Sequence, residues 1–411
     1  MTPLELTLLE ERPGLPRRWW ILGVLGTVAF MIEFELFAVA VAVPSIAGEF
    51  TGASLAAVAC VLGAYMMVSA ALTVPCARLT DRFGLRPMLL AGLAVFLTGS
   101  ALGGVAPSIP VLVAGRVVQA VGAAVIAPTL LGLLLPSFAK SRRALVISLW
   151  AAVTAAATTT GPVIGGLLAA ADWRWILLSK LPIGAAMIAL GFWCLPQIPR
   201  TATRTPRAAT LLRDREFTSA AAGLFVHSVS FVAWLLVAVL LLQELWHYGV
   251  VRAGLVLTVP ALSTALISMN TGRLTGRRGR VLWPVAGLLI TAGGWVAALT
   301  AVPGDHQSRL SLVLFLASGA AAGLVQAPLL ASAPTGTATL NTVRLLGAAV
   351  GVTVTAWLLS GSDLSASLTA YRPAMWLPTI ASAAGAVLLL ALRSSSFHRG
   401  PRVKKASITD Q

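Results

Sequence analysis

Long runs of apolar residues, separated by short polar stretches, recur along the whole chain of 411 residues. A membrane-spanning helix needs about 20 mostly apolar residues, and runs of this length occur twelve times. The predicted spans are 19–44, 54–76, 88–106, 110–136, 144–169, 175–196, 218–242, 250–270, 281–302, 309–331, 338–360 and 374–393. The pattern therefore predicts an all-α integral membrane protein with twelve transmembrane helices.

The composition agrees with this class, because 57% of the residues are hydrophobic and only 11% are charged, against about a quarter charged in soluble domains. A net charge of +16 would suggest a nucleic-acid partner in a soluble protein. Here the basic residues lie in short gaps between apolar runs, so we expect a lipid bilayer and no nucleic acid. Cys60, Cys76 and Cys194 have no metal-ligand or disulfide spacing, and no metal site is expected.

Most Lys and Arg residues lie in alternate gaps, on the same side as the residues before the first span. Since cytoplasmic loops carry excess positive charge, both termini are predicted to be cytoplasmic. Residues 1–18 are too polar for a signal peptide and are interpreted as a cytoplasmic tail, as are residues 394–411. The excess of Ala, Gly and Arg over Lys is typical of a high-GC bacterium, so the predicted location is a bacterial plasma membrane.

A short basic segment occurs twice, as ARLTDRFGLR at Ala77–Arg86 and as GRLTGRRGR at Gly272–Arg280. An internal repeat in an apolar chain indicates two related halves that share a site between them. The longest connector, 197–217, contains Pro199, Pro206 and five arginines. The predicted organisation is therefore a six-helix bundle at 19–196, a cytoplasmic linker at 197–217 and a second six-helix bundle at 218–393.

The first basic segment resembles the signature G-x-L-a-D-r-x-G-r-r of the major facilitator superfamily, found between its helices 2 and 3. Ala77 and Leu85 depart from this signature. The resemblance implies a fold of two six-helix bundles and a loop that latches one conformation. The implied latch residues are Asp81, Arg82, Gly84 and Arg86. Asn341-Thr342-Val343-Arg344 resembles the family's N-x-x-R, and implies that Arg344 braces the helix end near this loop.

Two further motifs are similar to the drug:proton antiporter, or multidrug efflux, branch of this family. Arg116-Val117-Val118-Gln119-Ala120-Val121-Gly122 resembles R-x-x-q-G-x-G, whose arginine the family assigns to proton coupling. An arginine inside a span is costly unless it is paired, so Arg116 is expected to have a carboxylate partner. The fifth span carries the helix-5 antiporter motif G-P-x-x-G-G. Its residues are Gly161, Pro162, Gly165 and Gly166. Small residues allow helices to approach closely. Close helix packing by this motif is therefore part of its expected role in transport and not an alternative to it.

The run Trp173-Arg174-Trp175 with Pro182-Ile183-Gly184 is similar to the usually fourteen-helix group of that branch. Two features differ from that group: Lys180 takes the position of its Asn, and the 197–217 connector has no room for two more helices. We expect the Lys180 side chain to reach out to the membrane interface; a role in substrate binding is the alternative.

Glu33 and Glu35 are the two acidic residues deep in a predicted span. At about 100° per residue they point about 200° apart, so both cannot face a central cavity. A carboxyl group inside a membrane can change protonation near neutral pH, and charged groups there are functional candidates. Alignment to the family favours Glu35 for the cavity and for proton coupling, with Arg116 as its counter-charge and Glu33 second. The alternative is a fixed ion pair that joins the first and fourth spans.

Other polar and aromatic residues are weaker candidates for the cavity wall. His227 can relay protons or form a hydrogen bond between helices. The predicted lining residues are Phe34, Phe37, Tyr65, Gln119, His227, Trp234 and Gln326. Aromatic residues on such helices pack more often than they line pockets.

Together these features predict a proton-coupled secondary active exporter of amphipathic small molecules that works by alternating access, as a monomer. The chain lacks the phosphate-binding pattern G-x-x-x-x-G-K-[ST], and no cofactor is expected. No nucleophile with a base lies at catalytic spacing, so we expect no enzyme activity. Two alternatives stay open: proton-coupled uptake of a metabolite, and a carrier-derived membrane sensor or scaffold that does not transport.

Overall fold

A computed structural model describes residues 15–50, 52–197, 208–211, 214–274, 279–301, 309–331, 337–360 and 368–397. The fold is all-α, as predicted. Within the described residues ten helices are long and apolar enough to cross a membrane, and two shorter apolar segments, Leu282–Val296 and Gly319–Leu330, lie in two further helices. Each of the twelve predicted spans therefore coincides with a helix or a pair of consecutive helices, and the twelve-helix prediction is confirmed.

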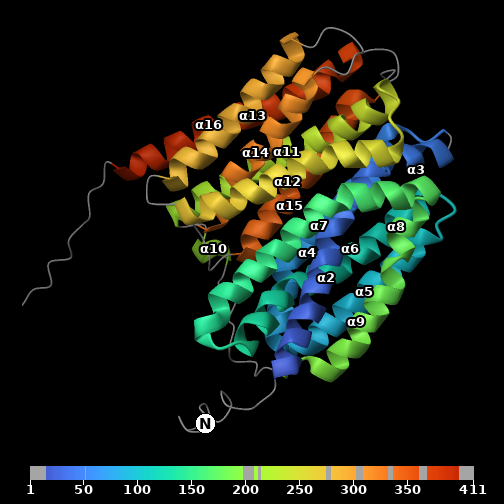
Figure 1. Ribbon diagram of the computed structural model, residues 1–411, viewed down its shortest axis with the longest axis vertical. Helices are drawn as coiled ribbons and strands as arrows, with labels where there is room; N and C mark the ends of the chain where they lie inside the picture. Colours follow the sequence, from blue (N-terminus) through green and yellow to red (C-terminus); the bar gives the residue numbers. More distant parts are fainter. Residues whose placement is uncertain are drawn as a thin grey trace, which may run out of the picture.

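The first six spans form a group that is blue to green in Figure 1. Its helices are α2 (Leu15–Val41), α3 (Val43–Glu49), α4 (Leu55–Phe83), α5 (Leu85–Gly104), α6 (Ile109–Leu134), α7 (Arg143–Ala171), α8 (Arg174–Leu178) and α9 (Lys180–Cys194). Short 3₁₀ turns, Leu135–Ser137 and Lys140–Arg142, lie between α6 and α7. Helix α6 packs against α4 and α5, and α2 packs against α7 and α9.

The last six spans form the yellow-to-red group of Figure 1. Its helices are α11 (Arg215–Leu240), α12 (Val250–Leu274), α13 (Gly279–Ala301), α14 (Arg309–Ala331), α15 (Thr337–Leu359) and α16 (Arg372–Phe397). A π-helical turn, Leu241–Leu245, extends α11, and a 3₁₀ turn, Leu368–Tyr371, precedes α16. Within the group, α11 contacts α15 and α16, and α14 contacts α12 and α13.

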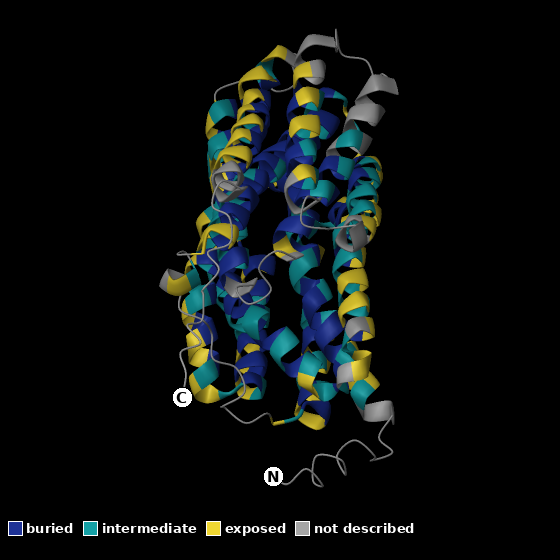
Figure 2. Ribbon diagram, turned by 90° about the vertical axis from the view of Figure 1, so that its left-hand side faces the viewer, coloured by how far each residue is buried: buried dark blue, intermediate teal, exposed yellow. Residues whose placement is uncertain are grey.

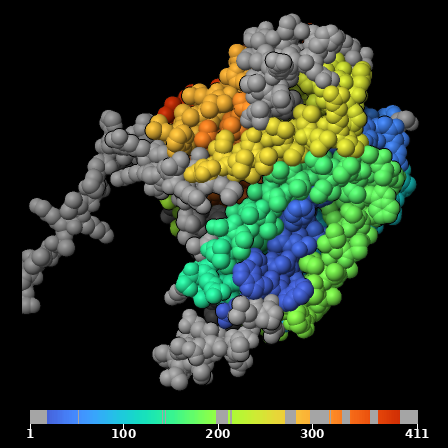
Figure 3. Space-filling view, viewed as in Figure 1, coloured from blue at the N-terminus to red at the C-terminus, as the bar shows by residue number. Residues whose placement is uncertain are grey.

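Two long helix contacts join the groups: α4 packs against α15, and α7 packs against α12. Figure 3 shows the yellow surface of α12 directly against the green surface of α7. In each of these contacts the second span of one group meets the fifth span of the other. The burial pattern is consistent with close packing of the two groups, because buried residues gather in the centre of the molecule and exposed residues lie on its flanks (Figure 2).

Three helix boundaries differ from the sequence prediction. The first span does not run to residue 44, because Pro44 lies in the first turn of a separate helix, α3, and proline disfavours a continuous helix through that position. The second span continues to Phe83, beyond residue 76, so most of the basic segment is helical. The sixth span is divided at Ser179 into α8 and α9.

The connection between α4 and α5 consists of one residue, Gly84, with φ 97° and ψ 153°. This backbone region is essentially restricted to glycine. The second copy of the basic segment falls largely outside the description, since residues 275–278 are not described. Most of the predicted linker, including residues 198–207, is likewise outside the described residues; a short helix, α10 (Ala208–Leu211), lies within it.

Candidate functional site

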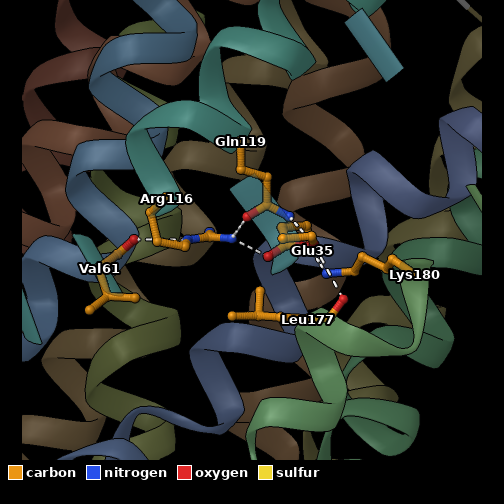
Figure 4. A network of polar contacts seen from close by, with 7 residues as sticks. Glu35, Val61, Arg116, Gln119, Leu177 and Lys180 are labelled. Carbon is orange, nitrogen blue, oxygen red and sulfur yellow. Dashed lines mark hydrogen bonds and ion pairs between the residues drawn. The ribbon is translucent and has the colours of Figure 1, made fainter. Parts of the chain in front are cut away.

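Glu35 of α2 is the centre of a buried charge network in the first group of helices (Figure 4). Its side chain is 0% exposed. One carboxylate oxygen, Oε1, forms an ion pair with Arg116 of α6, and the other, Oε2, forms an ion pair with Lys180 of α9. Three helices are thus connected through one carboxylate. The predicted pairing of Glu35 with Arg116 is present.

The Arg116 guanidinium makes several contacts besides Glu35. Its Nε donates to the backbone carbonyl of Val61 at 3.1 Å, and its Nη1 donates to Oε1 of Gln119 at 2.6 Å. Its Cζ atom lies 4.4 Å from the centre of the Tyr65 ring, a favourable cation–π position. Gln119 Nε2 in turn donates to Ser100 Oγ at 3.1 Å. A buried guanidinium needs such partners to offset its lost hydration.

The second acid, Glu33, occupies a different face of α2. Its carboxylate lies 3.5 Å from the guanidinium of Arg344 on α15, and both side chains are a little over a quarter exposed. Arg344 also donates to Oδ1 of Asn341, at 3.2 Å from Nε and 3.0 Å from Nη2. This pair joins a helix of the first group to a helix of the second.

Glu33 and Arg344 line a cavity between the two groups of helices. The cavity has a volume of about 280 Å³ and is enclosed by α2, α4, α6 and α7 on one side and by α15 on the other. Its lining residues lie in the first halves of α7 and α15, in the second half of α6 and near the middle of α2 and α4. Polar hydroxyls from Ser69, Thr73 and Thr154 interrupt a mostly apolar wall.

Glu35, which the alignment favours for the cavity, does not line this one: Glu33 lines it, while Glu35 is enclosed by helices. The angular separation of the two acids was correctly expected. Packing decides the assignment: α2 turns Glu35 towards α6 and α9, where two cations face it.

Of the predicted lining residues, Tyr65 is on this cavity. The others lie off it: Phe34, Phe37, Gln119, His227 and Trp234 are buried, and Gln326 is half-buried. His227 Nε2 and Gln326 Nε2 are 3.3 Å apart, joining α11 to α14. Phe37 meets Phe231 edge to face at 6.2 Å. Phe37, which was expected to line the cavity, thus takes part in aromatic packing between α2 and α11.

The segment predicted to act as a latch connects helix ends in the first group. Gly84 supplies the one-residue turn, and Arg86 Nη2 donates to the carbonyl of Phe192 in α9 at 2.5 Å. Arg82 is exposed with its guanidinium 5.5 Å from the Phe83 ring, and Asp81 is partly buried. Arg344 was expected to brace a helix end near this segment. Its described contacts are instead with Glu33 and Asn341 on the cavity wall.

The helix-5 motif lies where α7 approaches two other helices most closely. A Cβ atom on Gly161 would be 2.8 Å from Phe37 Cβ, and one on Gly165 would be 2.5 Å from Ala38 Cα, both on α2. A Cβ atom on Gly166 would be 2.8 Å from the carbonyl oxygen of Val250 in α12.

The contact between α7 and α12 also requires a glycine on α12. A Cβ atom on Gly254 would lie 2.3 Å from the carbonyl oxygen of Pro162. The motif therefore forms part of the contact between the two groups, beyond the cavity and towards the opposite end of the molecule. At that end Gln243 Nε2 donates to the carbonyl of Val41 at 2.9 Å, which also joins the groups.

A polar cluster joins α3 to the start of α8 at the end where α2 finishes. Arg174 Nη1 lies 2.7 Å from Oε1 of Glu49, Arg174 Nη2 donates to the carbonyl of Ala106 at 3.2 Å, and Trp173 Nε1 donates to Glu49. Slight burial would raise the pKa of Glu49, but the hydrogen bonds from Trp173 and Arg174 and the charge of Arg174 together outweigh burial and lower this pKa below its usual value of 4.5.

Lys180 is the residue of this site that the sequence interpretation missed. It was expected to reach the membrane interface, but its side chain is 3% exposed and directed at Glu35. Two signals pointed to this outcome: a lysine at a position where the similar group has Asn, and a deep carboxylate elsewhere in the same bundle. Their meeting depends on how α2 and α9 pack, which periodicity does not reveal.

The fold and site define a multi-pass membrane protein with a cavity between two groups of six spans. A family model described as Major Facilitator Superfamily matches residues 25–338, and the chain belongs to this family. Over 93% of its length it resembles the crystal structure of a bacterial homologue of the human lysosomal transporter Spinster in an inward-facing, occupied conformation. The TM-score is 0.74 and the identity 15%, and 96% of that chain is covered, which indicates the same fold.

Curated relatives match about half of the chain. It is 36% identical over 186 residues to the methylenomycin A resistance protein of Bacillus subtilis, covering 45% of this chain and 40% of that protein. It is 32% identical over 193 residues to the tetracenomycin C resistance and export protein of Streptomyces glaucescens, covering 47% and 35%. It is 34% identical over 197 residues to the multidrug efflux pump LfrA of Mycolicibacterium smegmatis, covering 46% and 39%. The matched part thus spans well under half of each relative's length.

Proposed function

We propose that the protein exports amphipathic small molecules in exchange for protons, by alternating access. The observation that carries this proposal is the cavity between the two groups of helices, which contains a carboxylate, a guanidinium and a mostly apolar wall. Pockets for drug-sized ligands have this composition, with a few polar groups on an apolar surface. The names of the similar proteins, which describe resistance, export and efflux, support the outward direction.

The 19–196 and 218–393 bundles would act as the two moving units. Because the basic loops favour a cytoplasmic N-terminus, the cavity would open to the cytoplasm in this conformation. The α7–α12 contact at Gly166 and Gly254 would close the other end. Rocking of one bundle against the other would then separate this contact and close the cytoplasmic end.

The buried network around Glu35 and Arg116 is the proposed coupling element, with Glu33 as a second acid in contact with the cavity. An ionisable group inside a membrane protein that is paired and enclosed by helices is a strong candidate for a proton relay. The proposed location is the bacterial plasma membrane with both termini cytoplasmic, and the proposed functional unit is a monomer.

The proposal is tested in a drug-sensitive bacterial host that lacks its own pumps, with a panel of antibiotics and lipophilic cations. Expression of the chain should raise resistance to at least one member of the panel. Inside-out vesicles from the same cells should accumulate a fluorescent member of the panel when energised, and a protonophore should abolish the accumulation. Movement out of such vesicles would indicate uptake into cells, and absence of any proton or probe movement would indicate a non-transporting protein.

A further inference from the structure

Lys180 is a buried cation whose role the proposed function leaves open. It is the first residue of α9, and its ammonium lies against Oε2 of Glu35 and 5.8 Å from the centre of the Phe34 ring. Figure 4 shows its side chain directed from α9 towards Glu35 and away from the outside of the bundle. A lysine placed only to anchor the helix would extend its ammonium to water.

The charges in this network do not balance when every group is ionised. Glu35 supplies one negative charge, while Arg116 and Lys180 supply two positive charges. All three side chains are almost completely buried. A buried positive charge without its own carboxylate loses its hydration and gains no compensating partner. The network therefore carries one excess positive charge in a water-poor environment.

Besides Arg17 and Arg18 in the first turn of α2, the helices packed against α9 carry charged groups that have partners of their own. On α2, Glu33 pairs with Arg344 on the cavity wall. On α5, Arg86 binds the Phe192 carbonyl towards the other end of α9. On α8, Arg174 pairs with Glu49. None of these described contacts neutralises Lys180.

Among the three members, the lysine is the one able to lose its proton. An arginine side chain stays protonated in proteins, and a carboxylate between two cations is stabilised in its ionised form. The network is also short of acceptors, since Arg116 Nη2 is buried without a hydrogen-bond acceptor among the described residues. Loss of a proton from Lys180 would remove the excess charge and leave an amine with a lone pair.

We propose that Lys180 is the group that takes up and releases the coupling proton. Glu35 stays ionised throughout and is paired with two cations in one state and with one cation in the other. This inference rests on the proposed proton-coupled transport. When the Nζ atom gains a proton, the ammonium binds Glu35 and holds α9 against α2, as in this structure. When the N–H bond breaks, the proton leaves to water and Glu35 is paired with Arg116 alone. Because Glu33 lies on the same helix, this change acts on α2 and so on the cavity.

Two substitutions separate a proton carrier from a counter-charge. Full-length protein in liposomes, with pyranine inside to report proton movement, is given a pH gradient and ethidium or another probe that the resistance panel identifies. Lys180→Arg keeps the positive charge but cannot lose a proton, so proton movement should fall to the level of protein-free liposomes. Lys180→Gln should also lose proton movement while still carrying the probe down its own gradient. Lys140→Arg and Lys140→Gln, at a lysine in the turn between α6 and α7, are the matched controls.

A second measurement uses the unmodified sequence, in case a substitution at this buried position prevents folding. The chain has four lysines, Lys140, Lys180, Lys404 and Lys405, so ¹⁵N-lysine labelling yields few NMR signals, with Lys180 assigned by its absence in Lys180→Gln. If that variant does not fold, Lys180 is assigned as the signal that persists in the triple variant Lys140→Arg/Lys404→Arg/Lys405→Arg. The Lys180 signal should change between charged and neutral forms over the pH range in which transport changes.

The results distinguish this inference from the proposed function itself. If wild-type protein moves neither protons nor any probe, the proposed function fails. If wild-type protein couples the two but Lys180→Arg couples them equally well, Lys180 is only a counter-charge and the inference is overturned. A Lys180 signal that stays charged throughout the working pH range would overturn it as well.

Discussion

The carboxylate of Glu33 on α2 and the guanidinium of Arg344 on α15 lie 3.5 Å apart on the wall of the cavity, so one ion pair joins the two halves of the chain. The pair is partly exposed, and pairs of this kind contribute at most about 1 kcal/mol. It is therefore strong enough to favour one arrangement of the halves and weak enough to be exchanged for a ligand.

The first prediction concerns this pair. Glu33→Gln and Arg344→Gln should each lower transport by about two- to fivefold, because each loses a pair worth up to ~1 kcal/mol. The charge-swapped double variant Glu33→Arg/Arg344→Glu should recover part of the loss. Transport assays on all three variants at matched expression check this. If the loss of transport in the swapped variant equals the two single fold-losses multiplied together, the pairing itself does not matter.

Glu35→Gln should abolish pH-gradient-driven transport, because the substitution leaves Arg116 and Lys180 without their shared carboxylate. Removing one partner of a buried ion pair costs about 3–5 kcal/mol, so thermal unfolding is measured beside transport. Adding Lys180→Gln removes one of the stranded cations, and the double variant should be more stable than Glu35→Gln alone. Full pH-driven transport by Glu35→Gln would contradict a coupling role for this network.

Gly254→Ala should weaken the conformation described above, because the new Cβ would lie 2.3 Å from the carbonyl oxygen of Pro162. Overpacking of this kind costs about 1–3 kcal/mol and would push α7 and α12 apart. A cysteine introduced at Val250 should then react faster with a water-soluble thiol reagent, in a background without the three native cysteines. Gly23→Ala is the control, since nothing lies within 4 Å of its Cβ position; an equal increase in both variants would refute the contact's role.

Gly84→Ala should lower the free energy of unfolding by about 1–3 kcal/mol, since any residue other than glycine is strained in this backbone region. The residue has φ 97°, and the space around its Cβ position is not tight: the nearest atoms, of Pro87, are 3.8 Å away. Strain and not crowding is therefore the expected cause. Thermal unfolding in detergent, with Gly48→Ala as an open-space control, checks the prediction, which a normal unfolding temperature for Gly84→Ala would rule out.

The Glu49 cluster should make part of the stability depend on pH. The pKa of Glu49 is lower in the folded protein than its usual 4.5, so its contribution is fully present above about 4.5 and is lost as the pH falls through the folded-state value. Wild type should unfold at a higher temperature than Glu49→Gln at pH 7, and this difference should shrink on acidification below 4.5. A difference that is the same at both pH values would disprove the linkage.

Local sequence was sufficient for features that depend on neighbours along the chain. Apolar run length predicted the helices, and the angular step of a helix predicted that Glu33 and Glu35 diverge. The cost of an arginine inside a membrane predicted that Arg116 has a carboxylate partner. Pro44 and Gly84 are also local signals, for the helix break after Val41 and for the one-residue turn between α4 and α5. The predicted span limits did not take them into account.

The sequence by itself thus determined the class of protein, the number of helices and the need for paired charges, because burial of apolar side chains and desolvation of charge act at every position alike. Only the tertiary structure decided that Glu33 faces the cavity, that Glu35 holds two cations and that Lys180 points inward. Those outcomes depend on the rotation of α2 and α9 about their own axes. That rotation is set by which small residues let neighbouring helices approach, at contacts between residues far apart in the chain.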